Sequence, residues 1–273
     1  IEGLYYFYSS STGTSTTLAV RDSTLWSGEG TTWTNESAPN YGSVLVDGGA
    51  QTGATLVVDG VTSDTYLPHI GSTFSIDGVE KVYTVLATPT ITAGGGTISI
   101  YPSLASSPAD NAAITFLSLS ATGGSKIRFH DFNFDSTERV AIVDGANYPA
   151  SWSTSEGLIV IDTNSDLVGA STVTTFKNHV FFGVGNRLVF SSPFSFTDYT
   201  AANGSGVFTF PSDVTGIIEF REKLIVFTTS SIHQLTGNSQ ADFSLSGISD
   251  DLGCVSSDTI AEVGGDILFL GPD

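Results

Sequence analysis

The sequence has little of several things on which other classes of protein depend. Of its 273 residues only one is a cysteine, Cys254, so no disulfide can form within the chain. Methionine is absent, and no stretch of about a dozen residues has the 3.6-residue apolar period of an amphipathic helix. No apolar run approaches the roughly 20 residues that a membrane-spanning helix needs. These absences exclude a disulfide framework and argue against a helical fold or a helical membrane span.

Basic residues are also scarce. Nine lysines and arginines stand against 28 acidic residues, which gives a net charge of -19. The nine are scattered singly, at Arg21, Lys81, Lys126, Arg128, Arg139, Lys177, Arg187, Arg221 and Lys223. Tight binding of nucleic acid needs clustered cations that displace counterions from phosphates. The charge therefore argues against a nucleic-acid-binding groove and fits either simple solubility or a surface past which DNA moves without adhering.

What is present suits strands and turns. Hydrophobic residues make up 40% of the chain and charged residues 14%, with serine, threonine and glycine prominent among the rest. Branched and aromatic side chains pack well on a pleated sheet, and glycine supplies tight turns. We therefore expect an all-β fold.

A repeat runs through the second half of the chain. Phe176 and Phe220 occupy equivalent positions 44 residues apart, and the match extends without a gap from Val173 to Leu188. A third copy follows at 263–270, offset by 43, and the stretches 140–145 and 18–22 resemble the same strand. Each copy reads as strand, short turn, strand, with 221–223 expected as one such turn. A period of 43 to 44 residues is the size of a propeller blade, so we expect a partial β-propeller; a sandwich or β-solenoid is the alternative.

A second module interrupts this repeat. Leu18 and Val140 lie roughly 79 residues further apart than one repeat allows. The segment between them has its own turn residues and strands of alternating polarity at 55–58, 73–76, 82–85, 97–100 and 114–116. This pattern is typical of a small β-barrel or sandwich. The expected domains are 1–41 for the first part of the propeller, 42–122 for the inserted domain and 123–273 for the rest of the propeller. Because both ends cut across expected strands, we expect a piece of a longer polypeptide.

The sequence carries no convincing catalytic or cofactor motif. The four histidines, at positions 69, 130, 179 and 233, stand alone, which is typical of surface or packing residues. The stretch from Asp131 through Asn133 to Asp135 places oxygen donors at alternate positions, as calcium loops do. However, Ser136 stands where such a loop has glycine, and no glutamate occupies its twelfth position. We prefer a strand with Phe132 and Phe134 inward and the acids outward, and we expect no cofactor and no enzyme activity.

Several strings resemble the β-propeller tail nozzle (tail tubular) proteins of short-tailed bacteriophages. They are Leu188-Val189-Phe190-Ser191, Phe196-Thr197-Asp198-Tyr199, Ser231-Ile232-His233-Gln234-Leu235-Thr236-Gly237, Leu252-Gly253-Cys254-Val255-Ser256 and the run from Val263 to Leu270. Asp144-Gly145-Ala146-Asn147 and Trp152 extend the likeness upstream.

The resemblance implies a virion structural protein in the phage tail. It implies a homo-oligomeric ring, commonly a hexamer, that contacts adaptor or portal and tail fibre proteins and encloses the channel for genome ejection, with DNA passing through. The alternative is a carbohydrate-binding or glycan-degrading propeller for host attachment, in which Trp26, Trp33 and Trp152 would stack on sugars.

Overall fold

The regular structure follows the composition. The computed structural model describes residues 2–21, 24–36, 44–61, 73–87, 89–92, 94–117, 126–161 and 163–272. Over these residues the chain forms β-strands and three short 3-10 helices, η1 (Ser165–Leu167), η2 (Ala201–Asn203) and η3 (Ser257–Thr259), and no α-helix. Within the described part, no helix is long and apolar enough to span a membrane. The all-β prediction is confirmed.

Four sheets each contain four antiparallel strands in the order of the chain. The first holds β1 (Gly3–Ser9), β2 (Thr14–Arg21), β3 (Thr24–Glu29) and β4 (Thr32–Asn35). The second holds β12 (Arg128–Asn133), β13 (Glu138–Val143), β14 (Ala150–Ser153) and β15 (Gly157–Val160). The third holds β16 (Thr172–Phe176), β17 (His179–Val184), β18 (Arg187–Phe190) and β19 (Gly206–Thr209). The fourth holds β20 (Val214–Phe220), β21 (Lys223–Thr228), β22 (Ile232–Thr236) and β23 (Ser244–Ser249), and a two-stranded sheet of β24 (Ala261–Val263) and β25 (Asp266–Leu268) follows. Successive four-stranded meanders are the unit of a propeller-like fold.

The repeated hairpins close through two-residue turns. Lys177 and Asn178 have φ values of 47° and 65°, and Arg221 and Glu222 have 50° and 62°. Gly264 and Gly265 occupy the same position in the last hairpin. Positive φ at both central residues is the type I′ geometry that matches the twist of paired strands. The expected turn 221–223 is therefore one residue too long, because Lys223 already pairs with Phe220.

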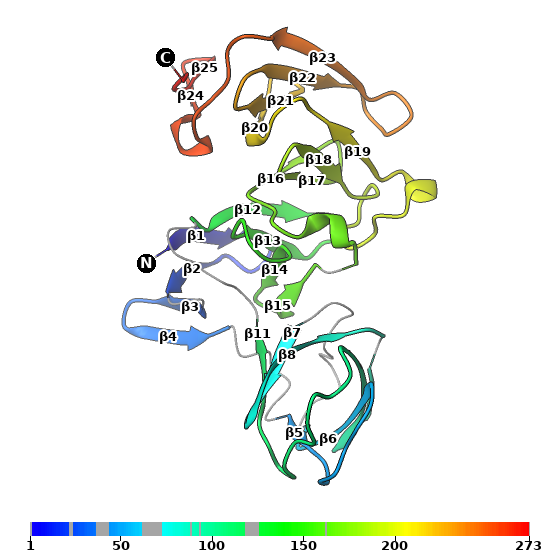
Figure 1. Cartoon of the computed structure of the whole chain (residues 1–273). Coiled ribbons are helices and arrows are strands. Elements are labelled where there is room, and N and C mark those ends of the chain that lie inside the picture. Colours follow the sequence, from blue (N-terminus) through cyan, green and yellow to red (C-terminus); the bar gives the residue numbers. More distant parts are fainter. Residues whose placement is uncertain are drawn as a thin grey trace. The chain divides into compact units, whose positions relative to one another are not determined.

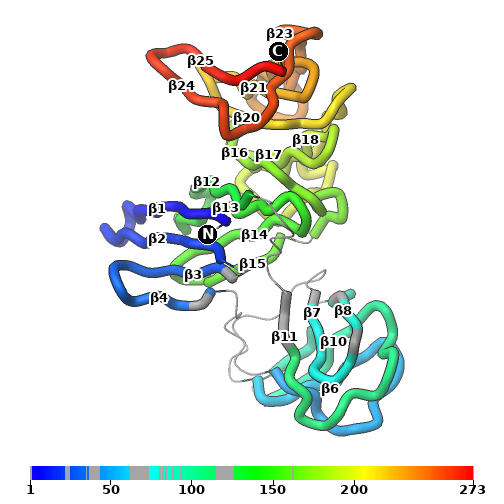
Figure 2. The backbone as a smooth tube through the Cα atoms, turned by 60° about the vertical axis from the view of Figure 1, so that its left-hand side comes forward, coloured from blue at the N-terminus to red at the C-terminus, as the bar shows by residue number. Residues whose placement is uncertain are grey.

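The inserted module is a small barrel. Its strands are β5 (Leu45–Val46), β6 (Thr55–Asp59), β7 (Thr73–Ile76), β8 (Val79–Val85), β9 (Thr90–Thr92), β10 (Gly95–Tyr101) and β11 (Ile114–Leu117). They form one sheet in the order β11-β7-β8-β10-β6-β5, with β9 beside β10. Figure 2 labels β11, β7, β8, β10 and β6 of this sheet. A bridge between Leu45 and Ala113 joins the two ends of this order, so the sheet closes on itself. Closure removes the exposed edges that an open sheet would present.

The chain divides into two compact units. Unit 1 comprises Ile1–Ser120 and Ala150–Asp162, and unit 2 comprises Ala121–Pro149 and Thr163–Asp273. The barrel lies in unit 1 and has its own apolar core, in which Phe74 and Tyr83 are the largest fully buried side chains. The expected domain boundaries at 41/42 and 122/123 lie outside the described residues.

In unit 2 each sheet packs on the next, from β16 to β25 (Figure 1). One apolar cluster joins the third sheet to the fourth, with Phe181 and Leu188 on one side and Leu224 and Val226 on the other. A second cluster joins the fourth sheet to β25 through Phe227 and Phe269. The repeat in the sequence is thus a repeat of sheets that cover one another's apolar faces, as in other repeat architectures.

Candidate functional site

Exposed acids recur at one position on the first strands of the sheets in unit 2. Asp131 on β12, Glu219 on β20 and Glu262 on β24 are all exposed. Glu219 lies next to Phe220 and Glu262 next to Val263, the two residues that occupy equivalent turn positions. Thr175 holds this position on β16. Because β12 lies beside β16 and β16 beside β20, Asp131, Thr175 and Glu219 belong to neighbouring strands.

The basic side chains, in contrast, are engaged within the fold. Seven of the nine have named partners, and each partner is a carboxylate, a carbonyl or amide oxygen, or an aromatic ring. Arg139 pairs with Asp135 and Arg187 with Asp166, both at 2.6 Å. The other five are Lys126 and Arg128 with Asp258, Arg221 with the Gly265 carbonyl, Lys223 with Gln234 and Lys177 over the Phe176 ring. Cations held in this way do not form the continuous row that grips a phosphate backbone.

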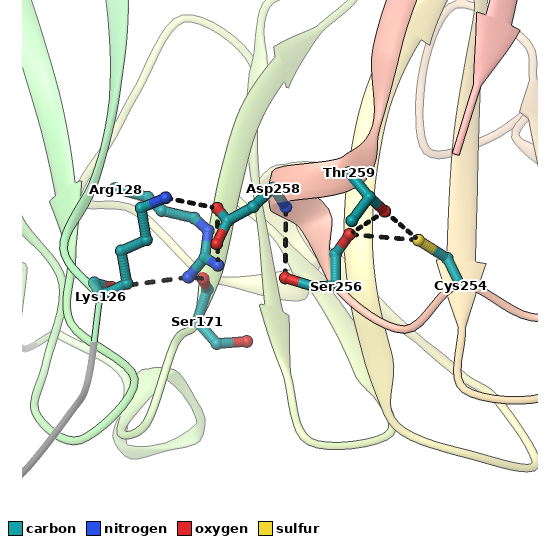
Figure 3. Close-up of polar contacts among 7 residues, drawn as sticks. All are labelled: Lys126, Arg128, Ser171, Cys254, Ser256, Asp258 and Thr259. Carbon is teal, nitrogen blue, oxygen red and sulfur yellow. Dashed lines mark hydrogen bonds and ion pairs between the residues drawn. The ribbon is translucent and has the colours of Figure 1, made fainter. Parts of the chain in front are cut away.

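A polar cluster links distant parts of unit 2 (Figure 3). The Asp258 carboxylate, in η3, lies 3.1 Å from the Lys126 amine and 3.2 Å from the Arg128 guanidinium. Arg128 also donates to the Ser171 carbonyl at 3.2 Å. Burial raises the pKa of Asp258, but the Lys126 hydrogen bond and the Arg128 charge outweigh it and hold that pKa below its usual range. These contacts lie where the first strand of a sheet begins, because Arg128 is the first residue of β12 and η3 directly precedes β24.

Cys254 contacts Ser256 and Thr259, which lie at the start and the end of η3. Its thiol is buried and donates to the Ser256 carbonyl at 3.2 Å, and Thr259 donates to the same carbonyl at 2.8 Å. Ser256 in turn accepts a hydrogen bond from the Asp258 backbone at 3.3 Å, which caps η3. The single cysteine is therefore a packing residue that helps to place Asp258.

The candidate calcium stretch is a strand only as far as Asn133, where β12 ends; Phe134 and Asp135 lie in the connection to β13. Asp131 and Asn133 are exposed on β12 and Phe132 between them is buried. Asp135 binds the Arg139 guanidinium through both oxygens, at 2.6 and 3.1 Å, and this hydrogen bonding lowers its pKa. Among the described residues, no group of three or more histidine, cysteine or acidic side chains is arranged to hold a metal ion. Calcium binding by Asp131, Asn133 and Asp135 was the less favoured alternative, and it stays untested.

The histidines of the described chain serve packing. The His179 ring is buried and contacts Phe190 and Phe243 at centroid distances of 5.6 and 5.3 Å. Its Nδ1 donates to the Ser191 carbonyl at 2.5 Å. Burial lowers the pKa of His179 despite this bond.

His130 links β12 to β16. Its Nε2 accepts from the backbone N–H of Thr175 at 3.0 Å, and burial lowers its pKa. His233 contacts Ser231 at 2.8 Å and the Phe210 ring. The remaining histidine, at position 69, lies outside the described residues.

The three tryptophans have two different environments. Trp152 is only 2% exposed and packs edge-on against Phe7, with ring centroids 5.9 Å apart, so it cannot stack on a sugar. Trp26 and Trp33 lie on the opposite face of the first sheet from the buried Leu18 and Leu25. Trp33 is 40% exposed.

Comparisons with known proteins add little beyond this. No family model matches the chain, and no curated protein does. One similar solved structure is described as a crystal structure of BBS1N in complex with ARL6DN, soaked with mercury; it shares 8% identity, with 98% of this chain and 91% of that chain covered and a TM-score of 0.28. At that similarity, the fold assignment depends on the strand order and pairing given above.

Proposed function

We propose that this chain is a structural protein of a phage virion, a component of the tail nozzle that forms part of the channel for genome ejection. The proposal includes a homo-oligomeric ring, in contact with adaptor or portal and tail fibre proteins, and a scaffold role without catalysis. Its starting point is the resemblance carried by strings such as 188–191, 231–237 and 263–270.

One observation supports the channel role most strongly. Exposed acids occupy the same position on three first strands, while seven of nine cations are held by partners within the chain. A surface of this kind repels phosphate, and DNA can pass it without adhering. Ejection is fast only if each phosphate leaves the channel wall as easily as it arrives.

Reversing the charge of these acids tests the idea. In phage carrying Asp131→Lys, Glu219→Lys and Glu262→Lys, the net charge of each subunit changes from -19 to -13, and we expect slower DNA release in vitro. We also expect the purified variant to bind duplex DNA with an affinity that falls steeply with salt, as it does when lysines replace counterions.

A matched control separates position from net charge. Asp47→Lys, Asp77→Lys and Asp251→Lys make the same charge change at exposed positions away from the first strands. This control is expected to release DNA at the wild-type rate. Equal slowing in both variants, or unchanged kinetics in the first, would count against a channel lined by these acids.

A further inference from the structure

His179 is a buried histidine with one unpaired ring nitrogen. Its Nδ1 bonds to the Ser191 carbonyl, which can only accept, so in the neutral ring Nδ1 carries the proton and Nε2 the lone pair. Nε2 is buried too, and among the described residues it has no hydrogen-bond partner. A buried polar atom without a partner is uncommon in folded proteins and calls for a physical explanation.

Aromatic rings surround this imidazole. The rings of Phe181, Phe190 and Phe243 lie 6.1, 5.6 and 5.3 Å from it between centroids, all of them edge to face. The neutral ring fits this space, whereas a protonated ring would hold a buried positive charge whose Nε2–H group lacks an acceptor. Burial accordingly lowers the pKa of His179, although the bond to Ser191 opposes that shift.

Phe243 is the ring whose displacement most readily admits water to the imidazole. Phe181 and Phe190 belong to the third sheet and are buried, whereas Phe243 is only partly buried. Phe243 is the last residue of the cap loop, which we define as residues 237–243 between β22 and β23 of the fourth sheet. The cap loop therefore covers His179 from the side of the fourth sheet.

The rest of the cap loop is exposed at residues 238–242. Its own bonds are short-range, since the Asp242 carboxylate accepts from the backbone N–H and the hydroxyl of Ser239, both at 2.7 Å. A hydrogen bond of 3.3 Å from the Gln240 amide to the Ser205 carbonyl joins the loop to the third sheet. A segment with so little buried surface opens at a lower free energy than the unit around it.

We propose that His179 is an acid-sensitive latch for the cap loop. While Nε2 is unprotonated, Phe243 stays packed on the third sheet. Protonation of Nε2 displaces Phe243, because the new N–H group must reach water, and the cap loop opens while the rest of unit 2 stays folded. This inference concerns the fold alone and does not depend on the proposed role in a phage tail.

The acids nearest the latch keep their charge between pH 7.5 and 5.5. Hydrogen bonds hold the pKa of Asp242, on the cap loop, and that of Asp198, in the β18–β19 connection, below the usual range. The other ionisable residues on β16–β18, on β20–β22 and in the β16–β17 turn are Lys177, Arg187, Glu219, Lys223 and His233. Among these residue types only histidine titrates in this range, so His233 needs a control of its own.

Hydrogen exchange tests the latch. Exchange of the cap-loop amides is measured by mass spectrometry at pH 7.5 and 5.5, and each rate is divided by that of the unfolded chain at the same pH. Because an unfolded histidine has a pKa of about 6.5, we expect acid to accelerate the normalised exchange by about five- to tenfold. At pH 5.5 the cap loop should also exchange at least about tenfold faster than the β20–β21 hairpin. Equal rates would mean that the whole unit opens and would overturn the latch.

Two variants remove the titrating group in different ways. His179→Phe keeps a ring in the aromatic cluster, and His179→Asn keeps a donor for the Ser191 carbonyl. Neither side chain titrates, so normalised cap-loop exchange should agree within about twofold at the two pH values. His233→Gln is the matched control, because His233 contacts Ser231 and Phe210 instead. This control should keep the wild-type acceleration.

Phe243→Ala removes the side chain that the latch holds. Its cap loop is expected to exchange fast at both pH values, so that acid adds less than about twofold. Acceleration by acid that persists in this variant, or in both His179 variants, would overturn the latch. A wild-type cap loop that exchanges alike at pH 7.5 and 5.5 would overturn it as well.

Discussion

Phe243 holds the third and fourth sheets together, and its removal has a predictable cost. Its ring stacks at 6.2 Å on Phe176 and meets Phe181, Phe190 and His179 at 5.9, 5.4 and 5.3 Å. Phe243 lies in the loop between β22 and β23 of the fourth sheet and is partly buried. The four rings it contacts belong to the third sheet. Phe243→Ala therefore removes contacts between sheets while it leaves both hydrogen-bonded ladders intact.

The expected loss is about 2–3 kcal/mol. A fully buried phenylalanine costs about 3–5 kcal/mol on truncation to alanine, and partial burial of Phe243 reduces the transfer component. Aromatic pairs contribute about 0.5–1.5 kcal/mol each beyond burial, although their contributions do not add fully. The fraction of unfolded unit 2 should therefore rise about 30- to 150-fold, at 1.4 kcal/mol for each factor of ten.

The chain offers a separate probe for each unit. Its three tryptophans, Trp26, Trp33 and Trp152, all lie in unit 1, so their fluorescence follows unfolding of that unit. The buried Cys254 lies in unit 2, and the rate at which a thiol reagent modifies it in urea reports how often unit 2 unfolds. We expect Phe243→Ala to accelerate the urea-dependent labelling of Cys254.

Phe194→Ala is the matched control. Phe194 is also a loop phenylalanine of unit 2, but it is 61% exposed. Its truncation should change stability by less than about 0.5 kcal/mol. If Phe243→Ala labels at the same rate as this control, the aromatic contacts of Phe243 do not hold the third and fourth sheets together.

Two further predictions concern pH and a glycine. Burial lowers the pKa of both His130 and His179 in the folded protein, so as pH falls the unfolded chain binds protons first. The free energy of unfolding therefore keeps its full value above about pH 6.5 and decreases below that pH, by at most about 1.4 kcal/mol per pH unit for each histidine. Urea midpoints that stay constant between pH 7.5 and 5.5 would contradict this. At Gly253 an added Cβ would lie 2.2 Å from the Thr229 carbonyl oxygen, so Gly253→Ala should destabilise unit 2 by about 1–3 kcal/mol. Gly49→Ala is the control, because no heavy atom lies within 4 Å of the Cβ added there. This control should leave the labelling of Cys254 unchanged.

The sequence predicted the strands better than their connections. The apolar runs around Val180 and Leu224 indicated buried strands, and both lie in sheet cores. The turn at Arg221 and Glu222 was placed one residue too long, because neither residue favours positive φ and nothing local signals a type I′ turn. Tertiary packing of the strands on either side imposes that geometry.

The exposed side chains of β1 and the Arg128–Asp258 ion pair could not be predicted from neighbouring residues in the sequence. The run from Leu4 to Tyr8 is apolar at every position, so alternation could not show which side chains would be exposed. The Arg128–Asp258 pair joins residues 130 positions apart, and only the folded sheets bring them together. The exposed acids at Glu219 and Glu262 follow the repeat, and their alignment was available once the turn positions were fixed.

We propose that this chain lines a genome-ejection channel in a phage tail. Cryo-electron microscopy of the intact particle, with an affinity label placed in the barrel at an exposed loop such as Gly48 and Gly49, tests it most directly. We expect label density arranged as a ring around the tail axis, below the portal. Particles that carry no label, or carry it only at the tips of fibres, would contradict the claim.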